Sequence, residues 1–199
     1  MLVSEEPAID LTVVLERFPD LEVEEGSGAL IVSPAIVSQV AEFLREDPSF
    51  SIDYLSNVTG VDYLAGERKE KRVNDEGKTE IVKIQEPARM DVVYHFYSIK
   101  LNHGPVILKQ RIADRDNPVA TSLMPFFRSA ELQEREVYDL FGIHFDGHSD
   151  LRRILMWEEF EDFPMRRDYC EPDDYEYEPT PHGDVLEKAK AHLSGGEES

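Results

Sequence analysis

The chain has 199 residues, 41% of them hydrophobic and 32% charged, which suits one domain with a hydrophobic core and a tail. Its formal net charge of −21 at pH 7 would repel nucleic acid and anionic lipid headgroups, so we expect neither as a direct partner. We also expect no membrane span and no secretory signal, because the apolar runs are short and the first residues have no basic region before an apolar one.

The first third of the chain predicts two helices with a short strand between them. Residues 8–18 carry apolar side chains near helical spacing, and residues 28–32 are typical of a strand. Ser33 and Pro34 suit the start of a helix, which we expect over residues 35–45. The side chains expected on its buried face are Ile36, Val37, Val40 and Leu44.

The middle of the chain predicts strands. Residues 50–64 alternate between strand-like pieces and turn residues, and the polar segment 66–78 contains a turn pattern at 74–77. Residues 89–100, which are rich in Val and Tyr, form the clearest strand. A second strand over 105–113 follows in a hairpin-like arrangement.

The last third of the chain predicts helix and then an extended segment. A helical region is expected over residues 121–141, and Gly142 is placed to end it in a left-handed conformation. Beyond Tyr169 the sequence becomes acidic and rich in Pro and Tyr, so we expect a tail that orders only against a partner. Residues 184–193 suit one short terminal helix.

This order of elements indicates an α+β fold: an antiparallel or mixed sheet with helices packed on one face, followed by an extended C-terminal tail. We accordingly divide the chain into three parts. Residues 1–120 form an α+β domain, residues 121–169 form a helix plus an interface region, and residues 170–199 form an acidic extended tail.

The single cysteine, Cys170, limits the redox chemistry of the chain. No disulfide can form within it, and an iron–sulfur cluster needs about four thiolates. No glycine-rich nucleotide-binding pattern is present either. If the chain belongs to a redox enzyme, we therefore expect it to carry no cofactor of its own.

Carboxylates, arginines and large apolar residues are concentrated in residues 134–169. On a helix, Arg135 and Asp139 are i,i+4 neighbours, and a solvated amphipathic helix would gain only weak ion pairs from them. The alternative is that these charges, beside aromatic residues, form an interface with another protein.

Two arginine pairs, at residues 152–153 and 166–167, suit bidentate binding of carboxylates. We expect them to clamp the loops around Asp150 and Asp168 or to reach a partner protein. A phosphate or quinone site is a further alternative.

Four side chains alternate along one short segment: His144, Asp146, His148 and Asp150. In an extended conformation they would lie on one face and could ligate zinc or iron in a stand-alone metal-dependent enzyme. Gly147 favours a turn that breaks this alternation, in which case His148 donates a structural hydrogen bond.

Three motifs in the segment follow one another in a fixed order. They are EREVYDLFGI over residues 134–143, GHSDLRRIL over 147–155 and PMRRDY over 164–169. Together they resemble the signature of the 30 kDa subunit family of respiratory complex I, the proton-pumping NADH:quinone oxidoreductase. This chain departs from the family pattern at three positions: the pattern has Trp where this chain has Leu132, and Pro where it has Ser149 and Cys170.

The resemblance implies a non-catalytic structural subunit of the peripheral (hydrophilic) arm, on the cytoplasmic side of the inner membrane. The chain would brace the quinone-reducing module, next to the quinone-site (49 kDa-type) subunit and the iron–sulfur subunits. Iron–sulfur clusters, FMN and quinone would reside in those partner subunits, and the parent complex would couple electron transfer from NADH to quinone to proton translocation. An equivalent subunit of a ferredoxin- or F420-linked or hydrogenase-type relative is the alternative.

Under this resemblance we expect no catalytic, cofactor-binding or metal-binding residue in the chain. We expect the partner interface to contain Glu134, Arg135, Glu136, Tyr138, Asp139, Phe141, His148, Asp150, Arg152, Arg153, Arg166, Arg167, Asp168 and Tyr169.

Overall fold

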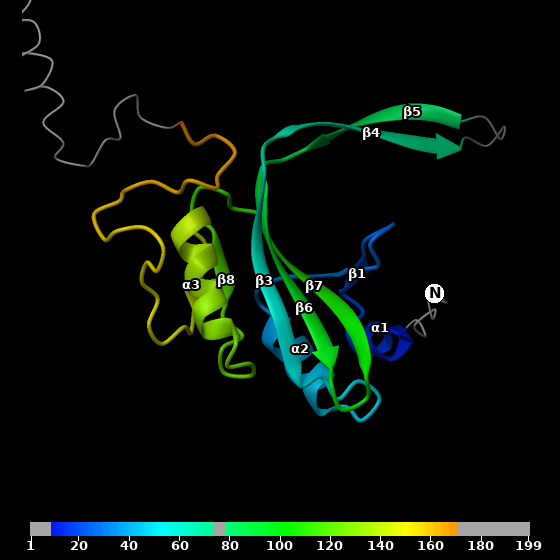
Figure 1. Cartoon of the computed structure of the whole chain (residues 1–199). Helices are drawn as coiled ribbons and strands as arrows, with labels where there is room; N and C mark the ends of the chain where they lie inside the picture. The colour runs from blue at the N-terminus through cyan, green and yellow to red at the C-terminus, as the bar shows by residue number, and fades with distance from the viewer. Residues whose placement is uncertain (1–8, 74–78, 171–199) are drawn as a thin grey trace, which may run out of the picture. The chain divides into compact units, whose positions relative to one another are not determined.

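The computed structural model describes residues 9–73 and 79–170, and the described residues up to Tyr169 belong to one compact unit. Its elements are labelled in Figure 1. In chain order they are α1 (Thr12–Arg17), β1 (Glu22–Val23), β2 (Leu30–Val32), α2 (Val37–Glu46), β3 (Tyr54–Tyr63), β4 (Gly66–Val73), β5 (Thr79–Glu86), β6 (Arg89–Ser98), β7 (His103–Ile112), β8 (Val119–Thr121), α3 (Ala130–Phe141) and β9 (His144–Asp146).

The central sheet has five strands in the spatial order β1-β2-β7-β6-β3. Strands β3, β6 and β7 are antiparallel neighbours, whereas β2 pairs with β7 in the parallel direction. Helices α1 and α2 lie against one face of this sheet (Figure 1). The α+β class with a mixed sheet is therefore confirmed.

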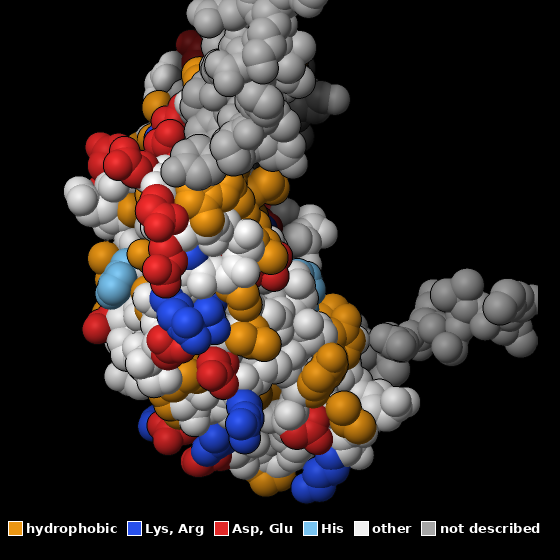
Figure 2. Space-filling view, turned by 60° about the vertical axis from the view of Figure 1, so that its left-hand side comes forward, with side chains coloured by type: hydrophobic (Ala, Val, Ile, Leu, Met, Phe, Trp, Pro, Cys, Tyr) orange, Lys and Arg blue, Asp and Glu red, His pale blue; other side chains and the backbone are white. Residues whose placement is uncertain are grey.

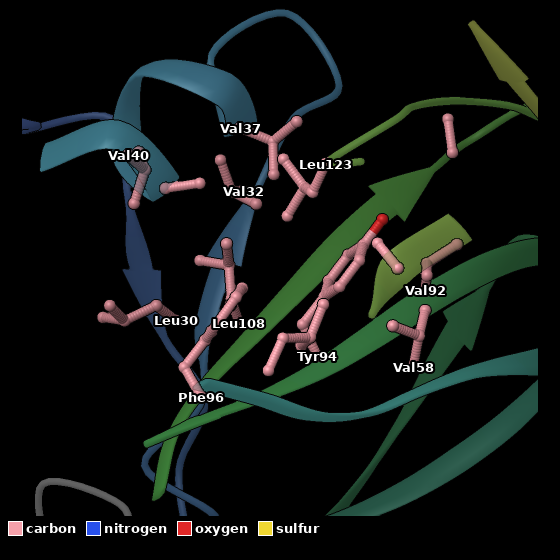
Figure 3. Packing of buried hydrophobic residues seen from close by; sticks show 14 of the residues in the cluster. Leu30, Val32, Val37, Val40, Val58, Val92, Tyr94, Phe96, Leu108 and Leu123 are labelled. Carbon is pink, nitrogen blue, oxygen red and sulfur yellow. The ribbon is translucent and has the colours of Figure 1, made fainter. Parts of the chain in front are cut away.

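The core lies between α2 and the sheet because alternate side chains of the strands point to the same face. Tyr94 and Phe96 of β6 are opposite Leu108 and Val106 of β7, and all four are buried. Apolar residues of α2 recur at helical spacing and cover them, as the sequence predicted. Figure 3 labels Leu30, Val32, Val37, Val40, Val58, Val92, Tyr94, Phe96, Leu108 and Leu123 of this cluster.

Strands β4 and β5 form a separate two-stranded ribbon that the sequence did not reveal. The ribbon continues the β3–β6 pairing, because Tyr63 pairs with Arg89 and Gly66 then pairs with Glu86. Figure 1 shows it extending past the end of the central sheet. From the sequence, residues 66–78, which include β4, are predicted as a polar segment with a turn, and no element is predicted for residues 79–86.

The predicted helix over residues 121–141 is too long at its N-terminal end. Residues 119–121 form β8, which pairs in parallel with β9, and turns lead from there to α3. The side chain of Gln110 on β7 explains the difference. Its Oε1 accepts a hydrogen bond from the backbone N–H of Thr121 at 2.6 Å, and its Nε2 donates to the Thr121 carbonyl at 3.2 Å. These bonds hold residue 121 in an extended conformation.

Helix α3 lies along the outer edge of β3 and supplies partners for its backbone. The Ser129 hydroxyl donates to the Leu55 carbonyl at 2.9 Å, and the Gln133 side-chain oxygen accepts from the Val58 N–H at 2.7 Å. An uncovered strand edge is open to pairing with another chain, so α3 protects this one.

The other predicted elements differ mainly at their ends. The helix expected over 8–18 is α1, which begins at Thr12, and residues 50–64 contain one continuous strand with a bulge near Asn57. The turn at 74–77, the tail beyond residue 170 and the helix at 184–193 lie outside the described residues. Within the described ranges, we find no helix with the length and apolar character needed to span a membrane.

Candidate partner-binding site

The three motifs fold together as α3 and the segment that follows β9. We call residues 147–169 the signature loop; this segment contains no helix and no strand. It lies beside α3, on the side away from the central sheet (Figure 1). Its conformation therefore depends on contacts other than a backbone ladder, and charged side chains provide them.

Asp139 of α3 is the main anchor of the loop. It is fully buried, and its Oδ2 accepts hydrogen bonds from three consecutive backbone N–H groups: Ile154 at 3.0 Å, Leu155 at 2.7 Å and Met156 at 2.9 Å. Its Oδ1 accepts from Arg153 at 2.7 Å. Burial alone would raise the pKa of Asp139, but these donors outweigh it and hold the pKa below its usual value.

Arg153 links this anchor to the rest of the loop. Beyond its ion pair with Asp139, it donates to the Asp162 carbonyl at 3.1 Å. Its guanidinium lies 5.4 Å from the ring centre of Phe160 and 5.2 Å from that of Phe163. A planar cation that stacks and donates at once suits arginine and would not suit lysine.

Two further arginines join the loop to α3 in opposite directions. Arg135 of the helix donates to the carbonyls of Arg152 and Arg153, both at 3.1 Å. Arg166 of the loop donates to the carbonyl of Phe141, the last helical residue, at 2.8 Å. A cation near the C-terminal end of a helix also interacts favourably with the helix dipole.

Gly142 ends α3 in a left-handed conformation with φ of 72°, as the sequence predicted, and its N–H donates to the Tyr138 carbonyl. It also permits a close approach of the loop. A Cβ atom at this position would lie only 2.5 Å from the Phe163 ring. Phe163 in turn lies beside the guanidinium of Arg166, 4.8 Å from its ring centre. The glycine is therefore needed for both backbone and packing reasons.

The end of the loop is fixed to the central sheet by one arginine from the β7–β8 connection. Arg115 donates to both oxygens of Asp62 on β3 and to both oxygens of Asp168, at distances of 2.6 to 2.9 Å. Asp62 also accepts from the backbone N–H of Arg167 at 2.8 Å. Although burial opposes it, the donors hold the pKa of Asp62 below its usual value, and the Arg115 bond lowers the pKa of Asp168.

His148 lies in a turn at the start of the loop. Its Nε2 donates to the Glu131 carbonyl at 2.9 Å, and its Nδ1 accepts from the N–H of Asp150 at 3.1 Å. Gly147, with φ of 85°, breaks the alternation from His144 to Asp150. In the part of the chain that the structure describes, no three His, Cys, Asp or Glu side chains are grouped to hold a metal. The geometry of this turn gives the metal-dependent enzyme no support.

Glu134 occupies a different position from the one its place in the motif suggested. It is fully buried under the β8 segment, where it accepts hydrogen bonds from the Ser122 hydroxyl at 2.5 Å and the Leu123 N–H at 2.7 Å. No cation in the described residues pairs with it, and burial raises its pKa to about 7. Its direct contacts are thus within the chain.

The predicted interface residues all belong to α3 and the loop, but they differ in exposure. Three are buried: Glu134, Asp139 and Phe141. Six are half-buried: Arg135, Tyr138, His148, Arg153, Arg166 and Tyr169. Five are exposed: Glu136, Asp150, Arg152, Arg167 and Asp168.

The sequence prediction omitted the most exposed apolar side chains of the loop. Leu155 is 61% exposed, Met165 55%, Ile154 39% and Trp157 37%. Figure 2 shows apolar and acidic side chains next to one another on this side of the molecule. The sequence feature that could have revealed them is the group of large apolar residues in a stretch that forms neither helix nor strand.

The prediction also omitted the partners that the rest of the fold supplies. Asp62, Arg115 and Ser122 all bind motif residues. Asp62 and Ser122 occur in segments with no charge pattern of their own, and Arg115 lies in an ordinary polar loop. Only the tertiary structure brings them to the motif.

Comparison with known proteins places this arrangement in a family. The family model for the 30 kDa subunit of respiratory-chain NADH dehydrogenase matches residues 30–175. The second C-type subunit of the NADH-quinone oxidoreductase of Rhizobium etli (strain CIAT 652) is 35% identical over 170 residues, which cover 83% of this chain and 79% of that protein. The C-type subunit of the same enzyme in Roseiflexus sp. (strain RS-1) is 37% identical over 169 residues, covering 81% and 84%.

Among solved structures, a chain of the membrane-bound sulfane sulfur reductase, an archaeal respiratory membrane complex, matches 90% of this chain and 89% of its own length with a TM-score of 0.57. At 19% identity this likeness concerns the fold alone. The family model covers four of the five strands of the central sheet and all three motifs. On this evidence the chain belongs to the family of the 30 kDa subunit of respiratory-chain NADH dehydrogenase, as the motifs indicated.

Proposed function

We propose that the signature loop is the surface through which this chain, a non-catalytic subunit of the peripheral arm of an NADH:quinone oxidoreductase, braces the quinone-reducing module. The family makes the chain a subunit of this multi-subunit enzyme. Its immediate neighbours in our proposal are the quinone-site (49 kDa-type) subunit and the iron–sulfur subunits. Iron–sulfur clusters, FMN and quinone reside in those partners, and the assembly lies on the cytoplasmic side of the inner membrane.

One observation carries the proposal. Four charged residues of the motifs, Asp139, Arg153, Arg166 and Asp168, are engaged in internal bonds. Their combined effect is to hold an irregular loop in one conformation with apolar side chains outside. A catalytic site would instead direct titratable groups into a cavity. Fixing a loop in advance lowers the entropy lost on association, so this arrangement favours binding to another subunit.

The proposal is tested by removing the Asp139 anchor in the complete chain. Asp139→Asn leaves the size of the side chain unchanged but removes the charge that four donors share, so the loop loses its fixed shape. We expect less assembled complex on native gels of membranes, with normal NADH:quinone turnover for each complex that does assemble.

Asp146→Asn is the matched control, because Asp146 is exposed on β9 and no side-chain bond of its own is present among the described residues. It should leave both quantities unchanged. Normal assembly of Asp139→Asn together with a collapse of turnover per complex would show that the loop has a catalytic role, and the proposal would be wrong.

A further inference from the structure

Between Arg153 and Arg166 the signature loop separates its charges by sign, whereas Arg152 and Arg167 outside this stretch are exposed. Its well-bonded arginines, Arg153 and Arg166, point into the loop, where their guanidinium groups lie beside aromatic rings. The carboxylates of residues 158–162 point outward, toward solvent. The segment ILMWEEFED, residues 154–162, contains four acidic residues and no basic one. Each of those four is exposed.

Phe160 produces this separation. It is buried, with 3% of its surface exposed, and its N–H donates to the Trp157 carbonyl at 3.1 Å in a turn. The ring of Trp157 packs edge-on against it at 4.9 Å. With Phe160 turned inward, its neighbours Glu159 and Glu161 are directed to solvent. No ion pair within the described ranges engages Glu158, Glu159 or Glu161, so their charge is available to another molecule.

The same segment exposes apolar side chains that a solvated loop would not need. Ile154 and Leu155 stand next to these acids, and Leu155 is the more exposed of the two. The backbone N–H groups of Ile154 and Leu155 are held by Asp139, so their side chains are presented in fixed positions. Apolar groups with a charged rim are the usual arrangement of a protein interface.

We propose that residues 154–162 form an acidic–apolar ridge, and that it docks into a basic protein surface: an apolar hollow rimmed by lysine or arginine side chains on a neighbouring subunit. This inference rests on the proposed function and specifies the chemistry of the partner. Ile154 and Leu155 enter the hollow, and the carboxylates meet the basic rim. An anionic membrane surface would repel the same carboxylates, which is why the occupant is a protein.

The two parts of the ridge have different effects on binding. Apolar groups at the centre of an interface mainly determine how long the complex lasts, because water is excluded around them. Charges at the rim mainly determine the rate of association and the dependence on salt. Charge reversal should therefore change the rate of association and its dependence on salt, whereas apolar truncation should shorten the lifetime of the complex.

The test uses the complete chain in its own membranes. A triple variant, Glu158→Lys with Glu159→Lys and Glu161→Lys, reverses the charge of the ridge's rim. Leu155→Ala truncates the apolar side chain at the centre of the ridge. The control reverses three exposed acids elsewhere, Glu16→Lys with Glu22→Lys and Glu42→Lys, and so changes the net charge by the same amount. Circular dichroism and thermal melting of each purified chain establish that the variants fold alike.

The amount of each chain retained in the assembled complex is measured at low and raised salt. We expect the ridge triple variant to be retained about ten-fold less than the control at low salt, a size consistent with three rim charges. The difference should shrink as salt is raised, because screening weakens the repulsion. Leu155→Ala should lower retention at both salt concentrations.

Two results overturn the inference and leave the proposed function intact: equal retention of both triple variants, or a loss caused by Leu155→Ala alone. Failure of the proposed function looks different, because the unaltered chain would then be recovered without iron–sulfur and quinone-site subunits. Native mass spectrometry of the gently extracted, tagged chain makes that distinction.

Discussion

Glu134 and Asp139 lie five residues apart on the same helix, both are fully buried, and their environments move their pKa values in opposite directions. Asp139 accepts hydrogen bonds from a guanidinium and three N–H groups, and these donors favour its charged form. Glu134 has a hydroxyl and one N–H, and the described residues give it no cation. The number and charge of the donors decide which carboxyl stays ionised under burial.

Glu134 should therefore make the stability of the chain depend on pH. Its folded pKa of about 7 lies above the ordinary 4.5, so the folded state binds the proton more tightly. That contribution is complete below pH 4.5 and is lost as pH rises through 7. Each pKa unit is worth about 1.36 kcal/mol, so about 3 kcal/mol is at stake. Glu134→Gln should raise the free energy of unfolding by up to that amount at pH 8.

Urea unfolding at pH 5 and pH 8 checks this prediction, with Glu136→Gln, exposed on the same helix, as the control. The glutamine oxygen can accept from the Leu123 N–H, and its amide can donate to the Ser122 hydroxyl, so no buried group is left unpaired. If Glu134→Gln changed the stability equally at both pH values, its carboxyl would not titrate near 7 in the folded chain.

At the scale of elements, the contact between α3 and the signature loop depends on the glycine at the helix end. The chain provides two glycines with positive φ in this region that differ in their surroundings. Gly142 lies against the Phe163 ring, whereas a Cβ at Gly147 would meet nothing within 4 Å. Comparing them separates backbone strain from steric overlap.

Gly142→Ala should lower the free energy of unfolding by about 2–4 kcal/mol, since it combines a left-handed alanine with overlap against an aromatic ring. Gly147→Ala should cost only the backbone part, about 1 kcal/mol. Thermal and urea unfolding of both variants measure the difference. Replacing Phe163 by leucine in the Gly142→Ala chain should recover part of the loss. Equal costs at the two glycines would mean that the loop does not pack closely on the helix end.

How well the sequence predicted an element depended on whether that element faces the core. The helix at α2 and the strands at β6 and β7 were found because burial on one side leaves a period in the sequence. Strand β4 leaves none, since its sequence is mostly charged. The start of α3 was misplaced because the side chain of Gln110, on a distant strand, holds residue 121 extended. For the arginine pairs the sequence left two main alternatives, a clamp on the loops around Asp150 and Asp168 or a contact with a partner protein. In the structure Arg152 pairs with Asp150 and Arg153 with Asp139, whereas Asp168 is bound by Arg115, which no local pattern singles out.

At the scale of the whole molecule, Arg115 joins the first and last parts of the compact unit. It is the shared donor to Asp62 on β3 and Asp168 near the end of the loop, and ionic hydrogen bonds to both carboxylates raise its pKa. Removing one member of a buried ion pair leaves the other charge without compensation, which costs about 3–5 kcal/mol. The pair with Asp62 is the buried one.

Arg115→Ala should therefore lower the free energy of unfolding by roughly 3 kcal/mol and speed amide hydrogen exchange in residues 164–169. Arg167→Ala is the matched control, because Asp62 receives the backbone N–H of that residue and its side chain is exposed. Unchanged exchange at residues 164–169 in the Arg115→Ala chain would show that the loop end is held by other contacts.

Asp62 also has a consequence for the order in which the protein can be made. Its donors are Arg115 and the backbone N–H of Arg167, which follow Asp62 by 53 and 105 positions in the chain. A nascent polypeptide therefore contains this strand before it contains the donors for the carboxylate. An unpaired charge resists burial. Arg115 compensates that charge as soon as the β7–β8 connection has been made, and the N–H of Arg167 adds a further donor only with the final motif.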